Sequence, residues 1–309
     1  MRVAILTAGG LAPCLSASIG ALIDNYSKEM PEAKLFGYLY GYQGLLKGDL
    51  FPFPPTNDID VNKLLDFGGS LLGNSRVKLT NKEDCVQRGL VADGDTPLEI
   101  AARQLQKDNI NILHTIGGDD TNTMAAALSN YLLENNYELT VIGLPKTVDN
   151  DIVPIKQSLG ADTAAQQGSI FFNNIVNENT SNPKTFIIHE VMGRHCGWLT
   201  AGTAYEYRKS LENMTFLPEL NMSKERWDVH AVYIPEIDID FQKESQRLRK
   251  CMDENDCVNI FLSEGAGMDT LSFEKSSHKG KKFQEMPLAM FVWMISILGS
   301  GLPNSLQKH

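Results

Sequence analysis

Cysteine is scarce in this sequence. Five cysteines occur among 309 residues, an odd number, and no two of them form a CxxC pair. This pattern argues against a disulfide framework and against a zinc site. Few and unpaired cysteines are typical of a reducing compartment, so we expect a cytoplasmic protein. We expect no signal peptide either, because Arg2 to Leu6 already has the apolar pattern of a buried strand.

Positive charge is also in deficit. The chain has 28 Lys and Arg against 38 Asp and Glu, a formal net charge of −10. Nucleic acids and anionic membranes bind basic surfaces, so we expect neither as a partner. The deficit does not exclude small phosphorylated ligands, because Mg²⁺ and a few local basic residues set the field where such a ligand binds.

Two acidic turns each follow an apolar run. Ile110 to Ile116 predicts a strand that ends in Gly117-Gly118-Asp119-Asp120-Thr121, and a helix is predicted over Asn122 to Leu133. Leu139 to Leu144 predicts the next strand, which ends in Pro145-Lys146-Thr147-Val148-Asp149-Asn150-Asp151. Successive turns of a parallel sheet lie side by side at the carboxyl ends of its strands, where open α/β sheets bind ligands. The sequence therefore predicts an α/β fold with a ligand site at these two turns.

The first turn combines features that attract and repel phosphate. Gly117 and Gly118 let the backbone approach a phosphate, and the following helix supplies free N–H groups and the positive end of its dipole. Asp119 and Asp120 would repel a bare phosphate, a conflict that is resolved if one carboxylate holds Mg²⁺.

The second turn adds the remaining chemistry. Asp149 and Asp151 provide a candidate general base, and Lys146 provides a point charge for phosphate. Together the two turns indicate metal-assisted phosphoryl transfer to a hydroxyl. Two solvated turns are the alternative, because Gly, Asp and Asn populate turns in any protein.

Four ordered motifs carry a resemblance to a known family. GGDDT from Gly117, PKTVDND from Pro145, Met192-Gly193-Arg194 and Ser263-Glu264-Gly265 resemble the phosphofructokinases, and the likeness covers Met1 to about Phe283. ATP-dependent members typically read GGDG and PGTIDND. An aspartate and a lysine stand at the two variable positions here, which resembles the pyrophosphate-dependent branch. The carboxylate would fill and charge the space that an ATP α-phosphate occupies, and the lysine can bind the smaller pyrophosphate.

The resemblance implies a fold and an activity. It implies two Rossmann-like three-layer α/β/α domains: residues 1–145 bind the donor, 146–264 bind the sugar phosphate, and 265–285 return to the first domain. It implies reversible transfer of a phosphoryl group from pyrophosphate to the 1-hydroxyl of fructose 6-phosphate, a step of glycolysis, in a homo-oligomer.

The resemblance also implies residue roles. Asp149 would deprotonate or orient the sugar hydroxyl, and Arg76 would steady the group in transfer. Asp119 would hold the Mg²⁺ cofactor, while Asp120 and Lys146 would select the donor. The positions expected to bind substrates are Gly9, which would approach pyrophosphate through its backbone, and Thr147, Val148, Asp149, Asp151, Met192, Gly193, Arg194 and Glu264.

The segment 286–309 departs from the family. Met286 to Leu302 is apolar, but it is at the short limit for a membrane span and is interrupted by Pro287, Gly299 and Gly301. A buried helix is equally allowed. Codons for Met286 to Met294 can be chosen so that a shifted frame encodes a sequence resembling the family's continuation. We therefore expect a frameshift product, natural or a sequencing artefact, and a C-terminally truncated enzyme. An ATP-dependent phosphofructokinase and a non-catalytic truncated subunit remain alternatives.

Overall fold

The chain forms two compact units. The computed structural model describes residues 1–55 and 60–267, and it divides at Ala161, with unit 1 before the division and unit 2 from Asp162 onward. The division falls later than the boundary predicted after residue 145. Residues 146–160 stay with unit 1 because they bond back to it: the Leu159 N–H donates to the Pro145 carbonyl at 3.0 Å.

The predicted C-terminal features are almost entirely outside the described residues. Only residues 265–267 of the segment 265–285 are described, and Ala266 among them packs into the core of unit 2. The hypothesis that the segment from about Met286 is a frameshift product also falls outside the described residues.

Unit 1 is built on a five-stranded sheet. Its strand order is β3-β2-β1-β4-β5, and every neighbouring pair is parallel except β2 and β3. The strands are β1 (Arg2–Thr7), β2 (Lys34–Tyr38), β3 (Leu50–Pro52), β4 (Ile112–Gly117) and β5 (Thr140–Pro145). The chain runs outward from β1 to β2 on one side and returns to β4 on the other. The order therefore reverses between β1 and β4, which is the point where open parallel sheets bind ligands.

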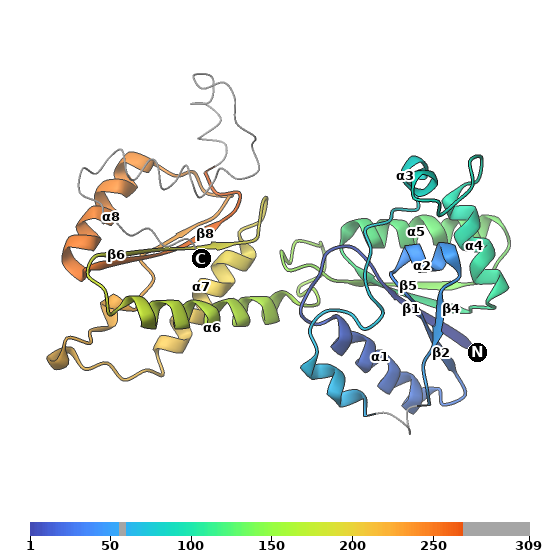
Figure 1. Ribbon diagram of the computed structural model, residues 1–309, viewed down its shortest axis with the longest axis horizontal. Helices are drawn as coiled ribbons and strands as arrows, with labels where there is room; N and C mark the ends of the chain where they lie inside the picture. The colour runs from blue at the N-terminus through green and yellow to red at the C-terminus, as the bar shows by residue number, and fades with distance from the viewer. Residues whose placement is uncertain (56–59, 268–309) are drawn as a thin grey trace, which may run out of the picture. The chain divides into compact units, whose positions relative to one another are not determined.

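Helices cover both faces of this sheet (Figure 1). One face carries α1 (Leu15–Glu29) and the 3₁₀ helix η2 (Val61–Asp66); the other carries α2 (Tyr42–Lys47), α4 (Pro97–Lys107) and α5 (Asp119–Glu134), and the short α3 (Lys82–Gln87) follows the loop that crosses the unit. Alternate side chains of a strand point to opposite faces, so β1 feeds both cores. Ile5 packs with α1, whereas Ala4 and Leu6 pack toward α2, α4 and α5.

Unit 2 repeats the three-layer plan on a smaller sheet. Its order is β6-β8-β7, all parallel, with β6 (Thr185–Val191), β7 (Ala231–Tyr233) and β8 (Cys257–Ser263). The helices are α6 (Ala161–Asn179), α7 (Trp198–Leu211) and α8 (Phe241–Asn255), and two 3₁₀ turns, η3 (Pro218–Leu220) and η4 (Lys224–Arg226), connect α7 to β7. The predicted fold, two Rossmann-like α/β/α units, is confirmed.

The two faces of the unit 2 sheet have different cores. Toward α6 and α7 an aromatic cluster forms, in which the Phe172 and Phe261 ring centroids lie 4.3 Å apart. Toward α8 the core is aliphatic, and Leu248 and Met252 of α8 are buried in it. The sequence of α8 is highly charged, yet its apolar positions four residues apart pack onto the sheet.

One local expectation needs correction. Helix α5 begins at Asp119 rather than Asn122, because Gly118 has the extended backbone of an N-cap (φ −75°, ψ −166°). After the second acidic turn an irregular segment leads from β5 to α6.

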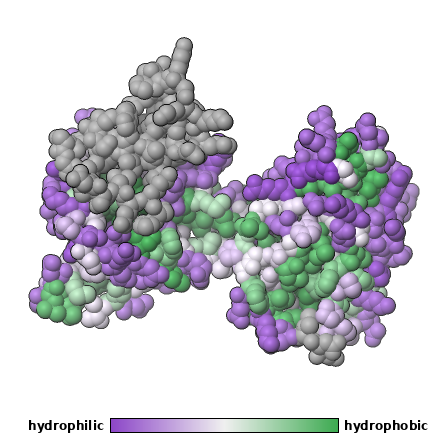
Figure 2. All heavy atoms as spheres, in the orientation of Figure 1, coloured by the Kyte–Doolittle hydropathy of each residue, from purple (hydrophilic) through white to green (hydrophobic). Residues whose placement is uncertain are grey.

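The outer surface of unit 1 is mixed. Hydrophilic residues predominate over the outward side of α4, as its amphipathic sequence predicts, while apolar residues gather around α1 and η2 (Figure 2). Leu65 and Phe67 beside η2 are 67% and 62% exposed. Among residues 1–55 and 60–267, none of the helices has the length and apolar character needed to cross a membrane.

Candidate active site

Two glycine turns meet at the point where the strand order of unit 1 reverses. Gly9 and Gly10 follow β1, and Gly117 and Gly118 close β4 and open α5. The turns are in contact: a Cβ placed on Gly9 would lie 3.3 Å from the Thr121 hydroxyl and 3.8 Å from the Gly118 nitrogen. Gly9 also has a φ of +85°, a conformation that side chains disfavour. Glycine is therefore needed there both for backbone conformation and for space.

Some backbone N–H groups of the two glycine turns are free to bind a ligand and others are not. The Gly9 N–H donates to the Ser75 carbonyl at 2.9 Å, so Gly9 has no free donor for a phosphate. The N–H groups of Gly10 and Gly118 make no hydrogen bond to the described part of the chain. Gly10 and Gly118 therefore have backbone N–H groups available for a ligand at these turns, whereas Gly9 does not.

The first turn of α5 carries both acidic residues of the GGDDT motif. Asp119 and Asp120 are exposed, and no described side chain caps the helix. Carboxylates at a helix N-terminus are stabilised by the helix dipole, so their position has a structural benefit as well as a chemical one. Asp120 also pairs with Lys78, whose ammonium lies 2.6 Å from its carboxylate.

Lys146 is the buried cation of the site. It is only 3% exposed, and its ammonium donates a hydrogen bond to the Gly10 carbonyl. Burial lowers its pKa, the neighbouring Cys14 acts in the opposite direction, and the charge of Arg76 lowers it further. The Lys146 backbone N–H donates to the Gly117 carbonyl at 2.8 Å. Lys146 therefore contacts both glycine turns, one through its side chain and one through its backbone.

Arg76 ends the glycine-rich loop that runs from residue 68. It is exposed, yet close enough to Lys146 for its charge to act there. The loop is bonded to β1, because the Thr7 hydroxyl lies 2.7 Å from the Ser70 hydroxyl and donates to the Gly73 carbonyl at 2.7 Å. The structure therefore brings Arg76, predicted from the family, to the same end of the sheet as Lys146.

The second acidic turn has a defined internal structure. The Asp149 N–H donates to the Thr147 hydroxyl at 3.1 Å, and Asn150 has a left-handed backbone with φ +53°. Ser158 fastens the turn: its hydroxyl donates to the Thr147 carbonyl at 2.6 Å and its N–H to the Asn150 side chain at 2.7 Å. Thr147, Val148 and Asp149 are half-buried and Asp151 is exposed. Ser158, which the sequence motifs did not indicate, fixes the turn that carries the predicted base.

The other predicted residues lie in unit 2 at the carboxyl ends of two neighbouring strands. Gly193 follows β6 with a φ of +139°, and its carbonyl accepts a hydrogen bond from the Ser263 hydroxyl at the end of β8. The Glu264 N–H donates to the Val191 carbonyl at 3.0 Å. A Cβ on Gly265 would lie 1.8 Å from the Arg194 carbonyl, so glycine is obligatory there.

The exposure of these side chains suits contact with a ligand. Met192 is 64% exposed, Arg194 is exposed and Glu264 is half-buried. The N-terminus of α7 already binds a carboxylate of the protein, because the Gly197 N–H donates to the Glu236 side chain at 2.8 Å. The N-cap N–H of α7 is therefore occupied, whereas the exposed Arg194 side chain can reach an anionic group.

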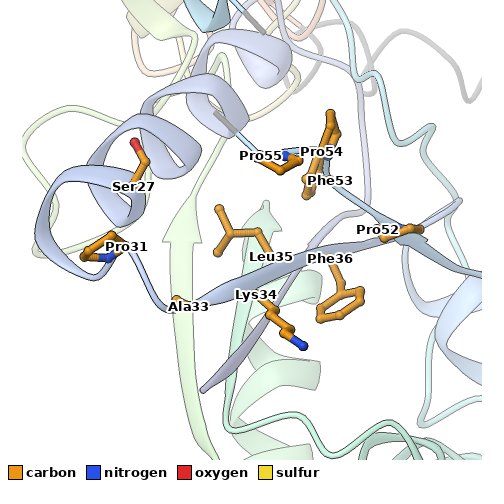
Figure 3. A pocket seen from close by; sticks show the side chains of 10 residues that line it. All are labelled: Ser27, Pro31, Ala33, Lys34, Leu35, Phe36, Pro52, Phe53, Pro54 and Pro55. Atoms are coloured by element: carbon orange, nitrogen blue, oxygen red, sulfur yellow. The ribbon is translucent and has the colours of Figure 1, made fainter. Parts of the chain in front are cut away.

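A groove elsewhere in unit 1 has a different character. It has a volume of about 480 Å³ and is lined by Leu35, Phe36, Phe53 and the prolines around them, between the end of α1 and the start of β2 (Figure 3). Arg2 of β1 lies opposite Lys34 of β2 at the start of their parallel ladder. The groove is therefore at the amino end of the parallel strands, and the glycine turns are at the carboxyl end. Of the described residues that line it, Lys34 alone is charged.

Comparison with known proteins identifies the family. The phosphofructokinase family profile matches residues 2–292 of the chain. The chain belongs to the phosphofructokinase family. The pyrophosphate–fructose 6-phosphate 1-phosphotransferase of Methylomonas methanica is 57% identical over 94% of this chain and 70% of its own length. The ATP-dependent 6-phosphofructokinase of Borreliella burgdorferi is 30% identical over 86% of this chain and 54% of its own length.

A solved structure of the family has the same fold. The pyrophosphate-dependent phosphofructokinase of Nitrosospira multiformis superposes with a TM-score of 0.69, over 96% of this chain and 66% of that one, at 20% sequence identity. At that identity the likeness speaks for the fold alone. The resemblance to the phosphofructokinases, predicted from four motifs, is confirmed.

Phosphofructokinases generally need a divalent metal ion. No group of three or more His, Cys, Asp or Glu side chains suited to a metal occurs within the described ranges. Asp119 supplies an exposed carboxylate beside the glycine turns, a hard oxygen ligand of the kind that Mg²⁺ accepts. Mg²⁺ usually takes only one or two protein carboxylates and fills its shell with water and phosphate oxygens. The donor set therefore fits Mg²⁺ bound together with a phosphate ligand.

Proposed function

We propose that this phosphofructokinase is a pyrophosphate–fructose 6-phosphate 1-phosphotransferase. It transfers a phosphoryl group reversibly from pyrophosphate to the 1-hydroxyl of fructose 6-phosphate, a step of glycolysis. The observation that carries the proposal is the contrast in identity: 57% to a relative named for pyrophosphate against 30% to one named for ATP. Asp120 and Lys146 at the two variable motif positions support the same donor.

The donor is assigned to the glycine turns of unit 1. An ammonium has three donors, and Lys146 uses one on the Gly10 carbonyl, which leaves two for pyrophosphate oxygens. Arg76 would steady the phosphoryl group in transfer through its planar guanidinium. Asp119 would hold Mg²⁺, which when bound neutralises phosphate charge. Asp120, paired with Lys78, would take up space that a nucleotide needs.

The acceptor needs a base and a sugar-phosphate site. Asp149, set in the turn fastened by Ser158, would accept the proton of the 1-hydroxyl or orient it for in-line attack. Thr147, Met192, Gly193, Arg194 and Glu264 would bind fructose 6-phosphate, with Arg194 suited to its phosphate by charge. Five free cysteines support the predicted cytoplasmic location, and a homo-oligomer stays a prediction.

A donor assay tests the proposal. The purified 309-residue chain is incubated with fructose 6-phosphate, Mg²⁺ and either pyrophosphate or ATP, and fructose 1,6-bisphosphate is measured. We expect turnover with pyrophosphate and at least about tenfold less with ATP. The double variant Asp120→Gly, Lys146→Gly should lose pyrophosphate turnover and narrow that preference. Turnover with ATP alone would refute the donor assignment, and turnover with neither would favour the non-catalytic alternative.

A further inference from the structure

We propose that Asn74 and Asn122 are positioning residues for the phosphoryl donor. Each side-chain amide holds two successive glycine carbonyls, one pair in each glycine turn, and so directs the following N–H groups toward the bound diphosphate. The inference deepens the proposed function and rests on it, because it concerns the site to which pyrophosphate is assigned.

Asn74 acts on the turn after β1. Its amide nitrogen donates to the Gly9 carbonyl at 2.7 Å and to the Gly10 carbonyl at 3.3 Å. Asn74 lies more than sixty residues further along the chain, with a separation of 65 from Gly9. A contact over that separation is not a local turn preference. It joins the loop that carries Arg76 to the turn that receives Lys146.

Asn122 acts on the turn after β4 in the same way. Its amide nitrogen donates to the Gly117 carbonyl at 2.9 Å and to the Gly118 carbonyl at 3.0 Å. Asparagines elsewhere in the helices, such as Asn25 and Asn135, bond to a single carbonyl four residues earlier. The bond to Gly117, outside the helix, distinguishes Asn122 from that ordinary pattern.

The effect on the backbone follows from peptide geometry. In a planar trans peptide the carbonyl of one residue and the N–H of the next point in opposite directions. Holding the carbonyls of the two glycine pairs therefore fixes four N–H groups on the other side of the same peptides. They belong to Gly10, Leu11, Gly118 and Asp119, and none of them donates a hydrogen bond to a described residue.

The amide oxygens show which half of each side chain is used. Oδ1 of Asn74 and Oδ1 of Asn122 are both buried and have no hydrogen-bond partner among the described residues. A buried acceptor without a partner is unfavourable, so it calls for an explanation. Here the NH₂ group of each asparagine donates both hydrogen bonds to the glycine carbonyls. This orientation of the amide leaves its oxygen without a partner.

Kinetics of the full chain test the inference. Asn74→Ala and Asn122→Ala each remove two neutral hydrogen bonds, so we expect the KM for pyrophosphate to rise by about tenfold in each variant. The KM for fructose 6-phosphate should stay within about twofold. Asn74→Asp should be at least as impaired as Asn74→Ala, because a carboxylate cannot donate to the glycine carbonyls and repels them. Asn135→Ala, at the C-cap of the helix that contains Asn122, is the matched control.

A binding measurement separates this inference from the proposed function. Methylenediphosphonate, a pyrophosphate analogue that cannot transfer a phosphoryl group, is titrated with Mg²⁺ into each variant by calorimetry. Weaker binding in the Asn74 and Asn122 variants but not in Asn135→Ala supports the inference even if the wild-type chain shows no turnover. Variants that bind the analogue as the wild type does overturn it, even if pyrophosphate turnover is confirmed.

Two further outcomes would also overturn the inference. If both substrate KM values rise together and the melting temperature falls in parallel, the asparagines hold the fold rather than the donor. If the wild-type chain binds no methylenediphosphonate and turns over no pyrophosphate, the inference and the proposed function fall together.

Discussion

Replacing Lys146 by methionine separates the role of its charge from the role of its bulk. The Lys146 side chain is 3% exposed, and its ammonium donates to the Gly10 carbonyl. Methionine keeps an unbranched, flexible side chain that can fill the same space. The substitution therefore removes the cation while leaving the packing between the two glycine turns largely intact.

The magnitude follows from the bonds that the ammonium can make. One of its three donors is used on Gly10, so two can bind pyrophosphate. A hydrogen bond from a charged donor contributes about 1.5–3 kcal/mol, and the first of these bonds alone corresponds to roughly 10- to 150-fold in affinity. We expect the KM for pyrophosphate to rise by about 10- to 100-fold in Lys146→Met. The KM for fructose 6-phosphate should change by less than about threefold.

Stability should not follow activity. Burial lowers the pKa of Lys146, and nearby Arg76 lowers it further, so the folded state disfavours this charge relative to the unfolded chain. Removing the charge relieves that cost, while losing the charged hydrogen bond to Gly10 costs about 1.5–3 kcal/mol. The two effects oppose each other, and we expect the free energy of unfolding to stay within about 1 kcal/mol of the wild type.

The assay is steady-state kinetics against pyrophosphate over a pH series, with thermal melting of the same samples. Lys28→Met, which removes an exposed lysine paired with Asp24, is the control. The charged form of Lys146 binds the donor, so the wild-type KM for pyrophosphate should rise on the alkaline side, with a midpoint below the ordinary lysine pKa of 10.5. The Met variant should lack that rise. An unchanged KM, or a loss of activity matched by a fall in melting temperature, would refute the reasoning.

Three other changes test separate parts of the structure. Asp149→Asn should lower kcat by about 10²- to 10⁴-fold with smaller changes in KM, and normal turnover would remove Asp149 as the base. Burial lowers the pKa of His189 to about 4 from 6.5, so the unfolded chain binds more protons between these values and stability falls as pH drops through that window. His189→Phe should abolish about 3 kcal/mol of that fall in pH-dependent denaturation, and an unaltered pH profile would contradict it. Lys78→Met should raise the KM for pyrophosphate by less than about fivefold and have no effect on an Asp120→Asn background; an equal effect on both backgrounds would show that the ion pair is not involved.

Much of the fold could be predicted from hydrophobic runs and glycine turns. The strands predicted over residues 110–116 and 139–144 form as β4 and β5, and their parallel pairing places the two acidic turns side by side as expected. Glycine and aspartate mark where buried strands end, so these signals are local and readable. The start of α5 was misplaced because Asp119 and Asp120 resemble a turn, although acidic residues are equally typical of the first helical turn.

What could not be predicted depends on contacts distant in the chain. Nothing local to Lys146 indicates that it is buried, because its burial comes from the turn after β1, 136 residues earlier. The same holds for Asn74, whose partners are Gly9 and Gly10. Lys78 could have been noticed, since it stands two positions after Arg76 on the same loop, but its pairing with Asp120 requires the tertiary structure. Sequence motifs identify the residues of this site, but only the tertiary structure shows which of their charges form ion pairs.

The ion pair between Lys78 and Asp120 changes the charge that a donor meets at the first turn. Counted along the sequence, Asp119 and Asp120 make the first turn negative, and only a metal ion would allow a phosphate to approach. In the structure Lys78 pairs with Asp120 at 2.6 Å, and the ammonium of Lys146 lies on the adjacent turn. Two protein cations therefore offset two carboxylates before any metal binds. An ion pair as exposed as that of Asp120 and Lys78 is worth at most about 1 kcal/mol. The charge of Asp120 therefore raises only a small barrier to the approach of a small anionic donor. Asp120 must then discriminate against a nucleotide more through the space that its side chain fills than through net repulsion. We therefore expect Asp120→Gly to admit ATP. Asp120→Asn, with a side chain of equal size and no charge, should still exclude ATP.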